Sequence, residues 1–126
     1  MSPNTKFART DVFDHIEIAD GRIWLLPEGI GCFCGGLSEE EQKLAWATAM
    51  PPAADVFARP YPGAAWNTKP CWYVVASEDH TVNPDLERFV ANRMKAATTE
   101  IVSSHAPMLS HPDVVLDVIR EAASSS

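Results

Sequence analysis

Apolar and polar residues alternate in two short runs near the start of the chain. Residues 16–19 read IEIA and residues 22–25 read RIWL, and the dipeptide Asp20-Gly21 separates them. Alternation with a period of two predicts strands, and Asp-Gly accepts the positive φ angles of a tight turn. We therefore predict an antiparallel hairpin over residues 15–26.

The apolar pattern then breaks in a glycine-rich stretch. Residues 27–36 read PEGIGCFCGG, with four glycines in ten positions, and we predict a loop there. Ser38 follows, with Glu41 three residues later, which is the spacing of a capping box at a helix start. The sequence predicts a helix over 39–49 that ends before two prolines, and the segment AADVF (53–57) can add one further turn.

The second half of the chain opens with a continuous apolar run. Residues 71–76 read CWYVVA, and a strand that is apolar on both faces is typical of a covered parallel sheet. Asn83-Pro84 supplies an N-cap and a first-turn proline for a helix. Its predicted apolar stripe is Leu86, Phe89, Val90 and Met94.

A β-branched run and a final helix follow. Residues 98–102 read TTEIV and predict a second strand. The last helix begins around Ser110 and Asp113, with Pro112 in its first turn. Its inward-facing residues are predicted to be Val114, Val115, Val118 and Ile119.

This order of elements brings two polar residues to one edge of the predicted sheet. A strand–helix–strand crossover is right-handed and makes the two strands parallel, so both strands end on the same side. Asp79 and His105 come just after those ends. Neighbouring strands lie about 4.8 Å apart, and ligands of open α/β sheets bind at this carboxyl edge. An aspartate there can fix the imidazole tautomer while the other ring nitrogen serves as a general base.

Composition narrows the class of protein. The chain has 126 residues, 46% of them hydrophobic and 21% charged, as in a soluble globular domain. A net charge of −7 without a basic cluster argues against nucleic acid and anionic membranes as partners. No apolar run approaches a membrane span, and the first residues lack the apolar core of a secretion signal. Three cysteines without a framework spacing suit reduced thiols, so we expect a cytoplasmic protein. We also expect no cofactor.

Four segments together resemble a known family. They are KPCWYVVASEDHTVNPDLERFVANRM, TTEIVSSHAPMLSHPDVVLDVI, DGRIWLLPEG and LSEEEQKLAWATAMPPAADVF. In combination they resemble the α/β-hydrolase superfamily, specifically small bacterial esterase-like members akin to plant methyl-salicylate esterases and hydroxynitrile lyases. The resemblance extends over nearly the whole chain from about Asp14. It implies that Asp79 is the acid of a catalytic triad and His105 its general base.

The resemblance also implies an architecture. We expect an α/β fold that corresponds to the C-terminal part of an α/β-hydrolase, with parallel strands, flanking helices and a small cap of hairpin and helices. The expected divisions are an N-terminal segment (1–13), a cap-like region (14–63) and a C-terminal core segment (64–126).

One departure from the family pattern concerns the nucleophile. The family order is Ser, Asp, His, with the serine in a G-x-S-x-G turn between a strand and a helix. No such motif occurs in these 126 residues; the nearest string, GCFCG, has Phe33 in the serine position, and no apolar strand leads into it. We therefore expect the nucleophile, the oxyanion hole and the first strands to come from upstream sequence or a partner chain.

Several residues offer alternatives. Ser104 directly precedes His105, and adjacent residues rarely align a hydroxyl with the ring nitrogen. Cys34 or Cys32 could act as a thiolate nucleophile, although thiols in glycine-rich loops are more often unreactive. Glu78 is the carboxylate that competes with Asp79.

Other conspicuous side chains have simpler interpretations. His80 and His111 are interpreted as a surface-loop residue and a helix-start residue. A metal site built from the Cys-x-Cys pair and a histidine has too few ligands to be expected. Four aromatic residues either line a pocket under the cap or belong to the core: Trp24, Phe33, Trp46 and Phe57.

Two functional hypotheses follow. The first is the acid-and-histidine portion of an esterase-like hydrolase, acting on a small ester-like substrate once completed. The second is a non-catalytic half-fold that self-associates or binds a partner. In both cases the open edge of 71–76, beside Trp72, Tyr73 and Val75, is a template for pairing with another chain. We expect a homo-oligomer or a complex with an N-terminal-half partner.

Overall fold

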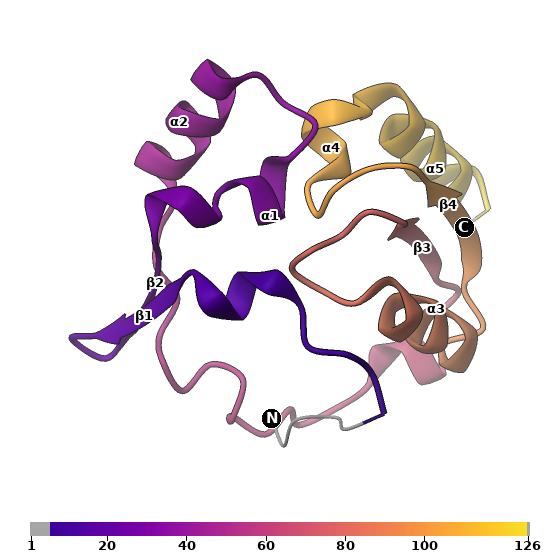
Figure 1. Ribbon diagram of the computed structural model, residues 1–126. Helices are drawn as coiled ribbons and strands as arrows, with labels where there is room; N and C mark the ends of the chain where they lie inside the picture. Colours follow the sequence, from indigo (N-terminus) through magenta and orange to yellow (C-terminus); the bar gives the residue numbers. More distant parts are fainter. Residues whose placement is uncertain (1–5, 126) are drawn as a thin grey trace.

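The computed structural model describes residues 6–125 and contains a hairpin region and a parallel-sheet region, shown in Figure 1. Strands β1 (Ile16–Ala19) and β2 (Arg22–Leu25) pair antiparallel, with Ile16 opposite Leu25. Asp20 and Gly21 between them have φ angles of 51° and 69°, so the turn is of the type I′ that the Asp-Gly dipeptide predicts. The predicted hairpin is confirmed.

The glycine-rich stretch is helical, so the prediction of a loop was wrong. A 3₁₀ turn, η2 (Pro27–Gly29), leads into a short helix, α1 (Gly31–Cys34). The Cys34 N–H donates to the Ile30 carbonyl at 2.9 Å, and both cysteines of α1 are buried. Burial of this one face outweighs the poor helix propensity of glycine.

Helix α2 (Glu39–Thr48) follows the prediction to within one residue. Its capping box is complete: the Glu41 N–H donates to Ser38 Oγ at 3.3 Å, and the Ser38 N–H donates to Glu41 Oε2 at 2.9 Å. Residues 53–57 form a bridge and turns instead of a helical turn, because Ala53 pairs with Arg22 of the hairpin. A long connection with one 3₁₀ turn, η3 (Ala65–Asn67), then leads to the second sheet.

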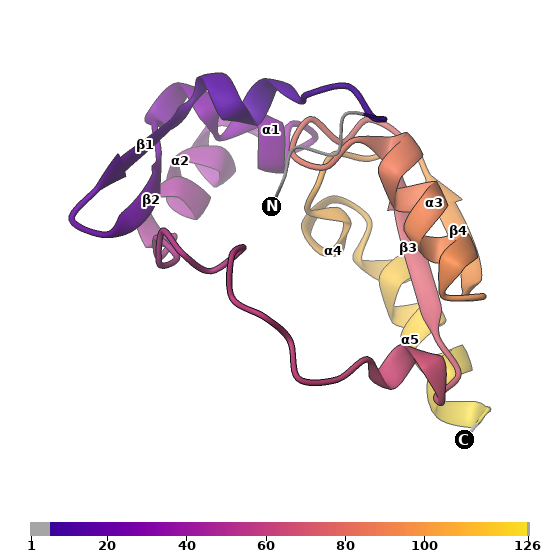
Figure 2. The same cartoon turned by 90° about the horizontal axis from the view of Figure 1, so that it is seen from below.

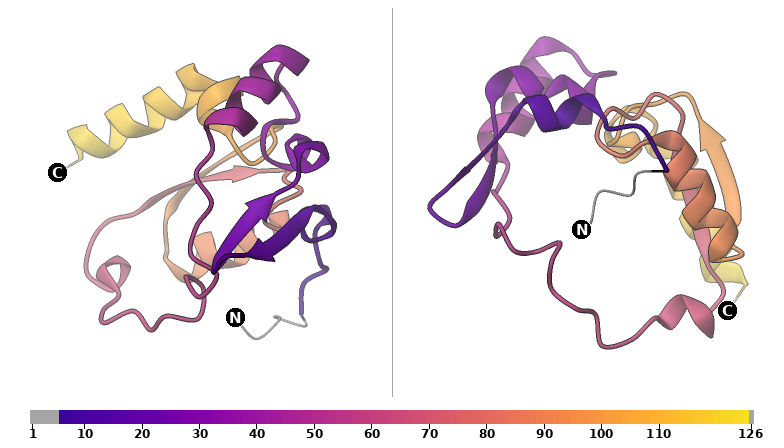
Figure 3. Two further views of the ribbon diagram at one scale, coloured as in Figure 1. Left: turned by 90° about the vertical axis from the view of Figure 1, so that its left-hand side faces the viewer. Right: turned by 60° about the horizontal axis from the view of Figure 1, so that its bottom comes forward.

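The second sheet has the predicted parallel arrangement. Strands β3 (Trp72–Ala76) and β4 (Ala97–Ile101) pair with Val74 opposite Thr99. Helix α3 (Pro84–Arg93) forms the crossover, and its N-cap Asn83 accepts the Asp85 N–H at 2.9 Å. A short α4 (Pro107–Ser110) and the longer α5 (Pro112–Ser124) end the described chain. Helices α3 and α5 lie on opposite sides of the sheet in both Figure 1 and the left-hand view of Figure 3.

The helices bury other residues than their apolar patterns predict. On α3 the buried residues are Glu87 and Ala91, whereas Phe89 is 41% exposed and stacks on Phe7 at 5.7 Å. On α5 none of the described residues is buried, and Ile119 is 58% exposed. The predicted apolar stripes assumed that a sheet covers the whole apolar face of each helix. The two-stranded sheet covers only part of that face on α3 and on α5.

The buried core is correspondingly small. Its apolar members are Val12, Cys32, Cys34, Val75, Ala76 and Ala91. Val12 belongs to the 3₁₀ turn η1 (Asp11–Asp14), whose backbone donates to the His80 carbonyl at 3.2 Å and so attaches the N-terminal segment to the loop after β3. Figure 2 shows the chain as an arc, with the hairpin and α2 at one end, the parallel sheet at the other and the long connection spanning them.

The outer edge of β3 is open. Within residues 6–125, β3 pairs only with β4, and the hairpin forms a separate two-stranded sheet. In the described part of the chain, no helix combines the length and the apolar character needed to cross a membrane.

Candidate active site

The loops that follow β3 and β4 run side by side. Beyond the strand ends, the Ser77 N–H donates to the Ile101 carbonyl at 2.9 Å, and the Glu78 N–H donates to the Ser103 carbonyl at 3.1 Å. These bonds extend the parallel pairing into the loops. They therefore hold Asp79 and His105 at the same carboxyl edge of the sheet.

Asp79 and His105 form a direct hydrogen bond there. The distance from His105 Nδ1 to Asp79 Oδ2 is 2.7 Å, and the Asp79 side chain is fully buried while that of His105 is 34% exposed. The other oxygen, Asp79 Oδ1, accepts the N–H groups of Thr81 at 2.6 Å and Val82 at 2.9 Å. A carboxylate that accepts three bonds fixes the imidazole with its proton on Nδ1, which leaves Nε2 as the basic nitrogen.

The electrostatics of Asp79 favour the charged form. Burial alone would raise the pKa of this carboxyl group, but hydrogen bonds from His105, Glu87, Val82 and Thr81 together lower it below its ordinary value. The structure thus brings the two predicted residues together in the geometry of an acid–histidine dyad. Their catalytic role remains a prediction.

Helix α1 packs against the dyad through Phe33. The Phe33 ring meets His105 edge-on, with ring centroids 5.2 Å apart. The Ser104 hydroxyl donates to the Phe33 carbonyl at 2.6 Å and accepts the Gly35 N–H at 3.0 Å. Ser104 therefore anchors α1 to the histidine loop, and its proton is directed to a carbonyl instead of the imidazole.

The two cysteines of α1 are poor candidates for a nucleophile. Burial raises the pKa of the Cys34 thiol. Burial also raises the pKa of Cys32, and the negative charges of Asp11, Asp14 and Asp79 raise it further. Because the thiolate is the reactive form, both shifts reduce nucleophilicity.

Glu87 is a third acidic residue at the site, and the sequence analysis missed it. It reaches the dyad from α3, is only 6% exposed, and its Oε2 accepts the Ala76 N–H at 2.9 Å. Burial raises its pKa to about 7, helped by a hydrogen bond to Asp79. The available signal was its spacing of three and four residues from Pro84 and Ala91, which puts it on the buried face of the helix.

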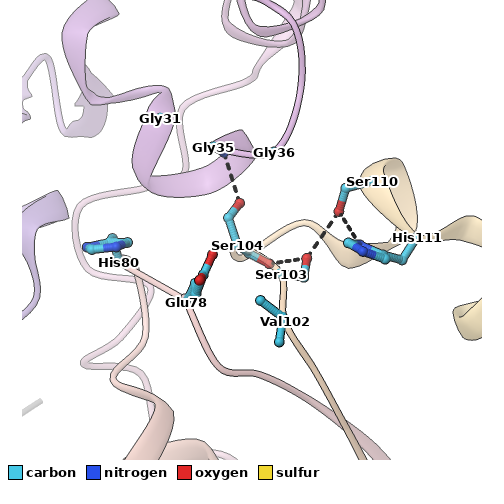
Figure 4. Close-up of a pocket in the computed structure, with 10 residues that line it drawn as sticks. All are labelled: Gly31, Gly35, Gly36, Glu78, His80, Val102, Ser103, Ser104, Ser110 and His111. Carbon is cyan, nitrogen blue, oxygen red and sulfur yellow. Dashed lines mark hydrogen bonds between the residues drawn. The ribbon is translucent and has the colours of Figure 1, made fainter.

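Glu78, the competing carboxylate, takes a different position. It is exposed and lines a cleft of about 480 Å³ on the other side of the loop, drawn in Figure 4. The structure therefore pairs His105 with Asp79 and not with Glu78.

The same cleft contains a chain of hydroxyl groups that ends at His111. Ser103 donates to the Ser104 carbonyl at 3.0 Å, so it accepts from Ser110 at 3.1 Å, and Ser110 in turn accepts from His111 Nδ1 at 2.9 Å (Figure 4). In this direction the histidine donates to the serine and does not activate it. His111 stands at the start of α5, and His80 is an exposed loop residue 2.7 Å from Asp11.

A second, more apolar groove runs along the open edge of β3 and includes the histidine. Its volume is about 400 Å³, and its lining residues are Trp72, Tyr73, Val74, Ala76, Glu87, His105, Pro107, Met108 and Val115. Trp72 Nε1 is buried without a hydrogen-bond partner among the described residues.

Three of the four aromatic residues proposed for a pocket or the core are not core residues, and neither of the two clefts described above includes them. Trp24, Trp46 and Phe57 are 42%, 39% and 64% exposed. The indole N–H groups explain the positions of the tryptophans: Trp24 donates to the Ala19 carbonyl at 3.2 Å and Trp46 to the Leu25 carbonyl at 2.9 Å. The Trp46 bond holds α2 against the hairpin, and the Trp24 bond lies within the hairpin.

Asp79, Glu87 and His105 are also close enough to hold a cation. One ligand atom from each lies within 4.8 Å of the others, which is the one such cluster in residues 6–125 and does not include the cysteines. The Nδ1 nitrogen and the Asp79 oxygens are already engaged in hydrogen bonds within the cluster and to the backbone. The arrangement is therefore suited first to sharing protons, and the expectation of no metal stays a prediction.

Comparison with known protein families gives a match over most of the chain. The sequence model of the family described as "Alpha/beta hydrolase family" matches residues 3–118. No curated protein matches the chain.

Proposed function

The chain belongs to the alpha/beta hydrolase family. We propose that it supplies the acid and the histidine of an esterase-like hydrolase, and that the serine nucleophile comes from upstream sequence or from a partner chain. The observation that carries the proposal is the 2.7 Å bond between buried Asp79 and His105. The proposal extends to the esterase-like subfamily that the sequence resembles and to a small ester as substrate.

The chemistry follows from the dyad. His105 Nε2 accepts the proton of the serine hydroxyl as its oxygen attacks the ester carbonyl, and the imidazolium then returns that proton to the departing alcohol. Water repeats the sequence and releases the acid from the acyl-enzyme. Asp79 holds the ring in the required tautomer and balances its positive charge while the proton is on Nε2.

The groove beside His105 indicates where a segment that carries the serine nucleophile would bind. His105 and the open edge of β3 share one surface, and the groove between them is mainly apolar. A strand added to that edge parallel to β3 would end at the same carboxyl side of the sheet as Asp79 and His105. The turn after such a strand is where a serine could face Nε2.

The experiment compares the chain alone with the chain completed. We expect the isolated chain to hydrolyse activated esters at the background rate and to remain unlabelled by a fluorophosphonate probe. We expect the reading frame immediately before Met1 to encode a strand, a G-x-S-x-G turn and a helix. Co-expression with that polypeptide should restore labelling of its serine. His105→Ala and Asp79→Asn should prevent labelling, and Glu78→Gln should not.

Two results would contradict this proposal. One is robust turnover by the isolated chain that His105→Ala abolishes, in which case Cys34→Ser is the next variant. The other is a completed assembly whose serine is labelled equally well with and without His105.

A non-catalytic half-fold that self-associates is the second candidate, and the open edge of β3 with its apolar groove favours it. A well-folded homo-oligomer that stays inactive with the upstream polypeptide present would support this candidate.

For either candidate function, the three cysteines, which are all free thiols, support a cytoplasmic location.

A further inference from the structure

Glu87 occupies a position that the proposed mechanism does not use. It projects from α3 beneath the end of β3, and its side chain is among the most buried polar groups of the described chain. Its Oε2 accepts the Ala76 N–H at 2.9 Å. The next N–H along the strand, that of Ser77, donates to β4, so the Ala76 N–H points to the open edge. Glu87 thus satisfies a strand-edge donor and touches the acid–base site at the same time.

The hydrogen bonds around Asp79 determine where the protons are. Asp79 accepts two backbone N–H groups on Oδ1 and His105 Nδ1 on Oδ2, so it is ionised. A carboxyl oxygen of Glu87 also lies within 4.8 Å of the carboxyl group of Asp79, and both side chains are buried. Two buried carboxyl groups this close repel each other when both are ionised, so one of them keeps its proton. That proton therefore belongs to Glu87.

We propose that Glu87 is a positioning residue that holds its proton against Asp79, so that a single negative charge lies behind the His105 imidazole. Loss of this proton places a second negative charge there. Two negative charges favour the imidazolium, which cannot act as a base, and they weaken the hold on the Asp79 carboxylate. The protonated glutamic acid thus keeps the dyad in its working charge state.

The surroundings of Glu87 leave few other groups to control this charge. The facing titratable groups are Tyr73 on β3, Asp79 after β3 and His105 after β4, with Cys32 of α1 beyond Asp79. The residues of α4 and α5 in the adjoining groove are apolar: Pro107, Met108 and Val115. Burial raises the pKa of Tyr73, and the charges of Glu87 and Asp79 raise it further, so this residue stays neutral. Burial likewise places the pKa of Glu87 at about 7.

This inference rests on the proposed role of Asp79 and His105, but its test needs no turnover. The isolated chain, labelled with ¹³C, is titrated by NMR from about pH 4 to about pH 9, which brackets the ordinary carboxyl range and neutrality. The signals followed are the Glu87 Cδ, the Asp79 Cγ and the ring of His105. We expect the Glu87 signal to change at about pH 7. The Asp79 Cγ signal should show an inflection at the same pH.

Two isosteric variants separate this role from a structural one. Glu87→Gln can still accept the Ala76 N–H and donate to Asp79, but it cannot lose a proton, so the shared inflection should disappear from Asp79. Glu78→Gln, on the exposed side of the loop, should leave it in place. A Glu87 Cδ that titrates in the ordinary carboxyl range would overturn the proposal, as would a shared inflection that persists in Glu87→Gln. If that variant does not fold, the wild-type titration decides by itself. An inactive completed assembly with the expected titration would contradict only the proposed function.

Discussion

At the scale of single residues, the fully buried carboxylate of Asp79 is the most exacting feature of the molecule. It has three hydrogen-bond donors, two from the backbone and one from His105. Asp79→Asn replaces the charge with an amide, whose oxygen can still accept the two backbone N–H groups but whose NH₂ group cannot accept the bond from His105 Nδ1. We expect a loss of about 2–4 kcal/mol in the free energy of unfolding, measured with urea. Glu78→Gln is the matched control and should change it by less than about 0.5 kcal/mol. Equal stability of Asp79→Asn and wild type would show that the buried bond does not form in solution.

Because of Glu87, the free energy of unfolding should fall as pH rises, whereas most acidic residues have the opposite effect. Its pKa is raised from 4.5 to about 7 in the folded state, so between these values the folded chain binds more protons than the unfolded chain. The free energy of unfolding should therefore fall as pH rises through this window, by up to roughly 3 kcal/mol, and level off above it. Asp79, with its lowered pKa, acts at lower pH, where its contribution is lost on acidification.

The measurement is a series of urea titrations at different pH values for wild type and Glu87→Gln. The difference between the two curves isolates Glu87, because Asp79 is present in both. The difference should slope through the window and be flat above it. Parallel curves across the whole range would mean that Glu87 is ionised in the folded state.

The sequence predicted some of these residues better than others. Asp79 and His105 could be placed because each directly follows a strand, and parallel strands end on one edge. Glu87 could not be found from the pattern of apolar residues. A buried helix face is recognised by its periodic apolar residues, and an acidic residue on that face weakens the pattern. Only the spacing to Ala91 indicated the face, and nothing local indicated that Asp79 would be opposite.

At the scale of elements, the short helix α1 is the part that sequence reasoning misjudged. Four glycines in ten residues predict a loop on propensity alone. The structure uses at least one of them for close packing: a Cβ on Gly29 would lie 2.5 Å from the His15 Cβ and 2.8 Å from Leu25 Cδ1. A Cβ on Gly31 would meet nothing within 4 Å. The glycines therefore differ in role although they look alike in the sequence.

This difference gives a paired prediction. Gly29→Ala forces the turn η2 away from His15 and Leu25 of the hairpin region and should lower the free energy of unfolding by about 1–3 kcal/mol. Gly31→Ala, in the open, should leave it unchanged or raise it by up to about 1 kcal/mol, since alanine is the better helix former. Urea unfolding of both variants measures this. Similar effects of the two substitutions would contradict the packing described for α1.

Local signals predicted the other elements well. The Asp-Gly turn, the capping box of α2 and the Asn-Pro start of α3 each depend on residues within one or two turns of one another, so they could be predicted without the fold. The buried faces of α3 and α5 depend on what covers them. Because the sheet has only two strands in the described chain, residues that a full sheet would bury are exposed.

At the scale of the whole molecule, the chain exposes an unusually large surface. Its accessible area is 8798 Å², about a third more than the roughly 6,600 Å² expected of a compact monomer of its mass, 13.8 kDa. The excess exceeds the area that standard protein interfaces bury. Part of the exposed surface is apolar, with Val102, Met108 and Leu109 all more than half exposed near the loops of the candidate site. This amount of unburied surface favours a partner in the working protein.

In the absence of any other partner, we expect the purified chain to form a homodimer across the open edge of β3. A two-fold axis would pair the two β3 strands antiparallel along Trp72 and Val74, since Glu87 already occupies the Ala76 N–H. Met108 lines the groove beside this edge and is 53% exposed, whereas Met50 lies outside it and is 87% exposed.

Met108→Glu therefore places one charge from each copy in a shared apolar interface and should shift the dimer towards monomer by about tenfold or more in dissociation constant. Met50→Glu changes the net charge of the chain by the same amount but lies outside the groove, so it should leave association unchanged. Sedimentation equilibrium at micromolar concentration measures both. A wild-type chain that sediments as a stable monomer and unfolds cooperatively would show that the open edge needs no cover. The open edge of β3, together with the unpartnered indole N–H of Trp72, would then be stable in water without a second chain. In that case the interpretation of this chain as one half of a larger sheet would be wrong.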